Sequence, residues 1–210
     1  MKDHIDGAAR ISSVTLAFND LSQTCESLAA SEASPKEMRR LFQDFVNNSQ
    51  KLTTYMRKEF SAQTGGAWAA SGFSGWNAVT NLFKELRNIG EHEEPIVLEI
   101  DYTWTYRNLG PNSDMTISFK GRWDKDSSLD DFPFDALEAS APDPSDKGKT
   151  IIITPTSVEH DYTLANNQSK IRELLREIGH ADIIKLTNEC LDVLMAYHDH
   201  YLSMLEANIV

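Results

Sequence analysis

The spacing of apolar residues changes twice along this chain, and that change limits its fold more than any other feature. Toward both ends, apolar residues recur every three or four positions, as they do on one face of an α-helix. Between about residues 96 and 165, apolar and polar residues alternate instead, which is typical of β-strands. Helices that precede and follow a block of strands do not alternate with them, so we expect no parallel sheet.

Three helices are predicted before the strands. The first spans about residues 11–28 and has a narrow apolar seam of the coiled-coil type. The sequence Ser34-Pro35-Lys36-Glu37 supplies an N-cap, a first-turn proline and an early acid, so a second helix should run from about Pro35 to about Phe60. The third helix is predicted from about Gly75 to Ile89.

The middle of the chain predicts a small antiparallel sheet. The segments IVLEIDYTWTYRN and SDMTISFKGRWD flank the turn sequence LGPNS, which favours a β-hairpin. The acidic, proline-bearing run 124–148 is predicted to be a long loop. The segments TIIITPTS and VEHDYTL predict one or two further strands.

The helical period returns after the strands, from Asn167 to Ala207, and Gly179 is expected to divide it into two helices. The glycine-rich stretch 65–75 is predicted to be a connection with Trp68 and Phe73 packed on the core.

The predicted fold class is therefore mainly α. We expect an antiparallel bundle of four or five helices, with a small antiparallel β insertion at about 96–165 between the third and last long helices. A chain of 210 residues with 40% hydrophobic content fits one domain, 1–210. An absence of long apolar runs and of a signal-like start predicts a cytoplasmic protein without a membrane partner.

Charge is unevenly distributed along the chain. The net charge of −12 argues against broad attraction to nucleic acid, yet residues 36–58 hold six bases against two acids, a net +4. The bases Arg39, Arg40, Lys51, Arg57 and Lys58 are therefore candidate RNA-binding residues, although a solvated helix face is the alternative. The run 124–146 holds eight acids against one base, a net −7, and could cover the basic helix or act as a solubilising loop.

The segment Arg87-Asn88-Ile89-Gly90-Glu91-His92 places catalytic residue types at the end of the third helix. On a regular helix Arg87 and His92 would lie roughly 140° apart, but an unwinding at Gly90 could bring them together. The imidazole of His92 titrates near neutral pH and suits an acid or base, and the guanidinium of Arg87 offers donors that match phosphate oxygens. The amide of Asn88 could orient the phosphate or the imidazole.

This motif, at the end of the third helix of a bundle, resembles that of the HEPN superfamily (higher eukaryotes and prokaryotes nucleotide-binding domains). The resemblance covers the helical parts of the chain. It implies a metal-independent endoribonuclease, a toxin or defence protein, with Arg87, Asn88 and His92 as catalytic residues. It also implies a homodimer whose two motifs line one cleft, RNA as the partner, and no cofactor.

Other interpretations of the motif stay open. Arg87 and His92 could instead cap the helix end, and Glu91, Glu93 and Glu94 should favour the protonated imidazole, which suits an acid better than a base. A non-catalytic binding or regulatory module that engages another protein, such as an inhibitory partner, is the alternative function, and an unrelated bundle with a chance motif is a third. No metal site is expected, because the His198 and His200 side chains would point roughly 200° apart on a helix.

Overall fold

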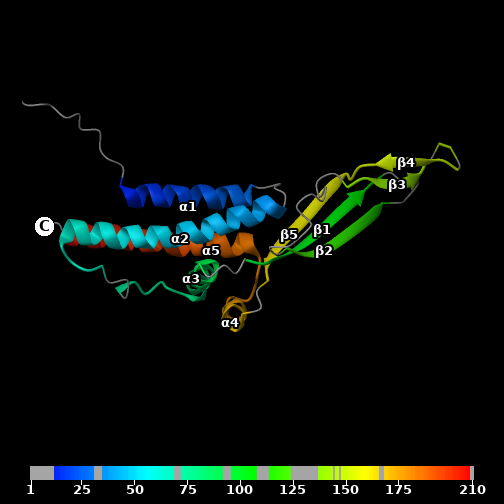
Figure 1. Ribbon diagram of the computed structural model, residues 1–210. Helices are drawn as coiled ribbons and strands as arrows, with labels where there is room; N and C mark the ends of the chain where they lie inside the picture. The colour runs from blue at the N-terminus through cyan, green and yellow to red at the C-terminus, as the bar shows by residue number, and fades with distance from the viewer. Residues whose placement is uncertain are drawn as a thin grey trace, which may run out of the picture.

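The computed structural model describes residues 12–30, 35–68, 72–91, 96–107, 114–123, 137–143, 145–146, 148–165 and 168–208. Within these residues the chain forms five helices and five strands. Figure 1 shows an elongated molecule with the helices at one end and the strands at the other.

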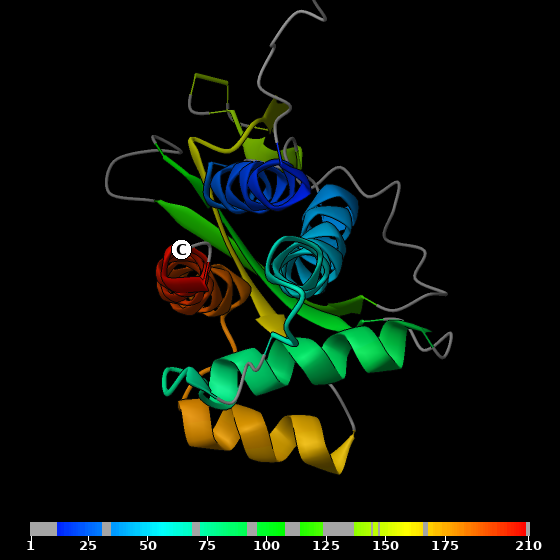
Figure 2. The same ribbon diagram turned by 90° about the vertical axis from the view of Figure 1, so that its left-hand side faces the viewer.

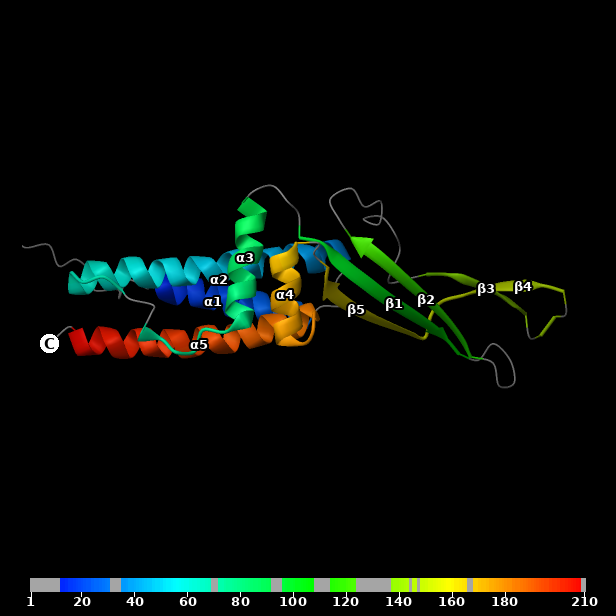
Figure 3. The ribbon, with the colours of Figure 1, turned by 90° about the horizontal axis from the view of Figure 1, so that it is seen from below.

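Three long helices lie side by side: α1 (Ser13–Ala29), α2 (Pro35–Thr64) and α5 (Ile183–Asn208). Helix α1 runs antiparallel to α2, whereas α2 and α5 run in the same direction (Figures 1 and 3). Helix α1 buries the predicted seam, which consists of Val14, Ala17, Leu21, Cys25 and Leu28. The predictions of the first two helices are therefore confirmed.

Two shorter helices, α3 (Ala78–Glu91) and α4 (Ser169–Ile178), lie across the three long ones, as Figure 2 shows. They pack on one another, and Lys170 Nζ lies 2.6 Å from Glu85 Oε1. The prediction of an antiparallel bundle is therefore only partly correct. Helices α3 and α4 pack on each other and cross the long helices, and they precede and follow the strands in the sequence. Gly179, with a φ of 93°, ends α4 as predicted and lets the chain turn into α5.

The larger sheet is antiparallel, with the strand order β2-β1-β5. Strands β1 (Leu98–Tyr106) and β2 (Met115–Trp123) form the predicted hairpin, and β5 (Ser157–Leu164) pairs with the other edge of β1. One face of β1 is buried along its whole length, by Leu98, Ile100, Tyr102, Trp104 and Tyr106. The alternation in the sequence therefore marks this face correctly.

A second, two-stranded sheet lies at the far tip of the molecule (Figure 1). It pairs β3 (Ala139–Pro142) with β4 (Thr150–Ile153) in antiparallel register. The prediction of a continuous loop over 124–148 is therefore wrong for β3. Alanine, serine and proline have low strand propensity, so the local sequence of β3 does not reveal that it pairs with the isoleucine-rich β4.

Helices and sheet share one core. A single cluster of buried side chains includes members of all five helices and of β1 and β5. Trp68 is 8% exposed, and Phe73 packs against the same cluster, so both aromatic residues return to the core as predicted. Among the described helices, none has the length and apolarity needed to cross a membrane.

Candidate functional site

Helix α3 has one polar face, which we define by Thr80, Asn81, Lys84, Arg87 and Asn88. At roughly 100° per residue, all of these residues lie within about 60° of Lys84 around the helix axis. The opposite side buries Leu82, Leu86 and Ile89 in the core. Core packing therefore fixes which side of α3 the polar residues occupy.

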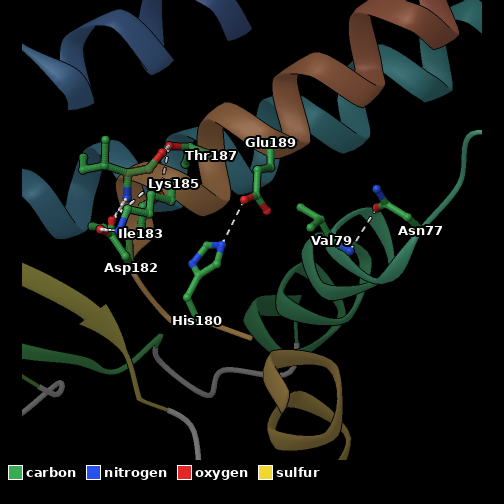
Figure 4. Close-up of polar contacts among 9 residues, drawn as sticks. Asn77, Val79, His180, Asp182, Ile183, Lys185, Thr187 and Glu189 are labelled. Atoms are coloured by element: carbon green, nitrogen blue, oxygen red, sulfur yellow. Dashed lines mark hydrogen bonds and ion pairs between the residues drawn. The ribbon is translucent and has the colours of Figure 1, made fainter. Parts of the chain in front are cut away.

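The start of α3 is fixed by reciprocal capping. Asn77 Oδ1 accepts a hydrogen bond from the backbone N–H of Val79 at 3.0 Å (Figure 4). It accepts a second one from the backbone N–H of Thr80 at 3.2 Å. In return, the Thr80 hydroxyl accepts a hydrogen bond from the Asn77 N–H at 3.1 Å. These bonds satisfy orphan donors of the first turn and fix where α3 begins.

Helix α5 is fixed at its start in a similar way. Asp182 Oδ1 accepts hydrogen bonds from the N–H groups of Ile184 and Lys185 at 2.9 and 3.1 Å, and His180 Nε2 lies 3.0 Å from Glu189 Oε1 (Figure 4). From this start, Cys190, Leu194 and Tyr197 follow at helical spacing on one side of α5.

A pocket of about 370 Å³ lies where α2, α3 and α5 meet. We call it the three-helix pocket. Helix α2 contributes Ser49, Gln50, Thr53 and Arg57, the segment before α3 contributes Trp76, α3 contributes Thr80, Asn81, Phe83 and Lys84, and α5 contributes Cys190, Leu194 and Tyr197.

The inner part of the three-helix pocket is apolar and aromatic. Phe83, Cys190 and Leu194 are buried, and burial raises the pKa of the Cys190 thiol, so this thiol stays protonated. The rings of Trp76 and Tyr197 lie 4.5 Å apart between centroids. The Trp68 indole N–H donates a hydrogen bond to the Tyr197 hydroxyl, which fixes the position of the Tyr197 ring.

The outer part of the three-helix pocket is positively charged. Arg57 and Lys84 are exposed and come from different helices, and the described lining residues include no aspartate or glutamate. Within the described part of the chain, neither cation is paired with a carboxylate. In a protein of net charge −12, this is a local reversal of sign.

Two of the predicted catalytic residues, Arg87 and Asn88, lie on α3 after the residues that line the pocket. Arg87 is half-buried and Asn88 is exposed, and each follows a pocket-lining residue by one turn. Helix α3 continues through Gly90 to Glu91, so the expected unwinding at Gly90 is wrong. His92 lies outside the described residues, and its approach to Arg87 stays a prediction.

The predicted RNA-binding residues of α2 occupy two lines along the helix. Arg39 and Arg57 share one line, while Arg40, Lys51 and Lys58 lie roughly 100–120° further round. Arg40 is paired with two acids: its Nη2 lies 2.6 Å from Glu37 Oε1, and its Nη1 lies 2.7 Å from Asp44 Oδ2. The hydrogen bond to Glu37 raises the pKa of Arg40 above its usual range. Lys51 Nζ lies 3.4 Å from Asp20 Oδ2. Of the five bases, only Arg57 lines the three-helix pocket.

Four residues that line the pocket, Gln50, Trp76, Asn81 and Lys84, are not among the site residues predicted from the sequence. The polar spacing 81, 84, 88 on a helix whose other side is apolar is the signal that could have indicated Asn81 and Lys84. No local signal shows that Gln50 and Trp76 converge on them, because that depends on how α3 crosses α2 and α5.

The side chains of His198 and His200 on α5 contact different neighbours and do not face each other, as predicted. The ring of His198 stacks on that of Phe18 at 4.9 Å, whereas the ring of His200 lies 5.6 Å from that of Trp68. Among the described residues, no group of three or more His, Cys, Asp and Glu side chains could hold a metal ion.

Comparisons with protein-family models, with curated proteins and with solved structures find no match to this chain. The resemblance to the HEPN superfamily therefore rests on the motif from Arg87 to His92 and on its place at the end of α3.

Proposed function

We propose that this protein is a metal-independent endoribonuclease that holds RNA on the polar face of α3. The observation that carries the proposal is the placement of Arg87 and Asn88 on the same side of α3 as Asn81 and Lys84. This arrangement offers a guanidinium, an ammonium and two amides along one helix, which are donors suited to successive phosphates.

The proposed reaction uses the RNA's own 2′-hydroxyl as the nucleophile. A base removes the hydroxyl proton, the 2′-oxygen bonds to phosphorus, and the bond to the 5′-oxygen breaks as an acid protonates that oxygen. Arg87 stabilises the added charge on the phosphoryl oxygens, Asn88 orients the phosphate, and His92 transfers a proton. In a two-fold homodimer, His92 of one copy would act as the base and His92 of the other as the acid.

Cleavage of a labelled RNA in the presence of a chelator tests this function. We expect wild type to cleave, and His92→Ala to lower the rate at least 100-fold, as loss of a general acid or base does. Arg87→Gln should also lower the rate while circular dichroism shows that the variant is folded. His4→Ala, which changes a histidine outside any motif, should cleave like wild type.

Failure of wild type to cleave any RNA in a varied panel would contradict the nuclease proposal. Equal cleavage by wild type and His92→Ala would do the same, because the activity would then come from another site or from a contaminant.

A non-catalytic binding module is the second candidate, and the composition of the three-helix pocket favours it. Among the described residues, the lining has cations, amides and hydroxyls but no histidine or carboxylate, so it can bind an anion without an acid or base that titrates near neutral pH. Such a module could also engage an inhibitory or regulated protein. Saturable RNA binding without cleavage, weakened by Lys84→Gln, would support this candidate over the nuclease.

A further inference from the structure

We propose that the three-helix pocket binds a small organic anion that carries a planar unsaturated ring. The inference goes beyond the proposed nuclease, because the ligand is a small molecule and none of the described lining residues belongs to the motif from Arg87 to His92. The pocket shares Asn81 and Lys84 with the proposed RNA-binding face of α3. A pocket of about 370 Å³ is large enough for a ligand of this kind.

The charge of the ligand follows from Arg57 and Lys84. These two cations enter from α2 and α3, and no carboxylate among the described lining residues neutralises them. The nearest acid on α3, Glu85, is engaged by Lys170 at 2.6 Å. Two uncompensated cations at the mouth of one pocket attract a phosphate or carboxylate group and disfavour a cationic ligand.

The shape of the ligand follows from the inner lining. Trp76 is half-buried at the wall, next to the buried Tyr197 ring, and Phe83 and Leu194 complete an apolar base. Flat aromatic walls over an apolar base favour a planar ring that can stack or pack edge-on against them. The phosphate or carboxylate would then lie toward the exposed cations.

The pocket lining also includes two side-chain amides that a ligand can engage, those of Gln50 and Asn81. Within the described part of the chain, the side-chain amides of Gln50 and Asn81 have no hydrogen-bond partner. A ligand with ring nitrogens or carbonyl oxygens would gain hydrogen bonds from the amide groups of Gln50 and Asn81.

Isothermal titration calorimetry with four probes tests the ligand class. Adenosine 5′-monophosphate and indole-3-acetate each combine a planar ring with an anionic group, whereas adenosine supplies only the ring and inorganic phosphate only the anion. We expect at least one ring-bearing anion to bind one per chain, at least tenfold tighter than adenosine and phosphate. A preference between the first two probes shows which combination of ring and anionic group the pocket favours.

Variants assign the binding to the pocket. Arg57→Gln and Lys84→Gln should each weaken the tighter ring-bearing anion about tenfold, and Trp76→Leu should weaken it as well. Lys120→Gln, which removes an exposed lysine of β2, is the matched control and should bind like wild type. Lys84→Arg, which keeps the charge, should retain most of the affinity.

Two results would overturn the proposal. One is that neither ring-bearing anion binds more tightly than adenosine or phosphate. The other is that Arg57→Gln and Lys84→Gln both bind like wild type while circular dichroism shows them folded. Loss of RNA cleavage has no bearing on either result, because the titration does not involve the Arg87 to His92 motif.

Discussion

Individual side chains show how this chain combines structural and chemical roles on one helix. In α5, Tyr197 is buried and lines the three-helix pocket, whereas the next residue, His198, stacks on Phe18 of α1. Burial lowers the pKa of His198, and the neighbouring Asp199 opposes this only in part. His198 therefore serves packing between α1 and α5, and its protonation opposes folding.

We expect His198 to make the protein less stable in mild acid. Because the pKa of His198 is lower in the folded than in the unfolded chain, the unfolded chain binds more protons, and stability falls as pH falls below about 6.5. His198→Phe should keep the stacking and remove this contribution. Urea unfolding at pH 7.5 and 5.5 should show a smaller loss of stability for the variant than for wild type. An equal loss in both proteins would contradict this role of His198.

At the scale of helices and strands, the sequence predicted the elements but not all of their arrangement. The period of apolar residues located the helices because each one buries a single face, and Gly179 correctly marked the break between α4 and α5. The crossing of α3 and α4 over the long helices could not be predicted in this way, since periodicity gives the buried face and not the partner. The short strand β3 was missed because its pairing with β4 comes from contacts across the chain.

The turn between α4 and α5 depends on a backbone conformation that glycine adopts easily. At Gly179, φ is 93°, and an added Cβ would meet no atom within 4 Å, so the cost of a side chain there is backbone strain alone. Gly179→Ala should lower the free energy of unfolding by about 1–2 kcal/mol. Gly179→Asn should cost less, because asparagine tolerates this region better. Urea unfolding would contradict this account if Gly179→Ala were as stable as wild type.

At the scale of the whole molecule, the proposed sites require helices from distant parts of the chain to hold together. The sequence predicted Arg87, Asn88 and Arg57 as site residues from their type and position. It could not predict that α2 and α5 bring Gln50, Trp76 and Tyr197 against the polar face of α3, because this convergence depends on tertiary packing. Helices and sheet contribute to the same buried cluster, which makes the arrangement one packed unit.

This shared core predicts that sheet and helices unfold together. Trp104 of β1 is 1% exposed, so Trp104→Ala should lower the free energy of unfolding by about 3–5 kcal/mol. The midpoints of helix loss, measured by far-ultraviolet circular dichroism, and of tryptophan fluorescence should shift by the same amount. Two separated transitions, or a circular dichroism midpoint unmoved by Trp104→Ala, would show that the sheet is a separate unit.

The central claim is that the polar face of α3 is where this protein meets its ligand. Backbone amide NMR spectra, recorded as a short single-stranded RNA is titrated into the full chain, test that claim most directly. We predict that the largest shift changes fall on α3 from Thr80 to Asn88 and on the facing residues of α2 from Ser49 to Arg57. Changes centred on the sheet, or no change at saturating RNA, would contradict the claim.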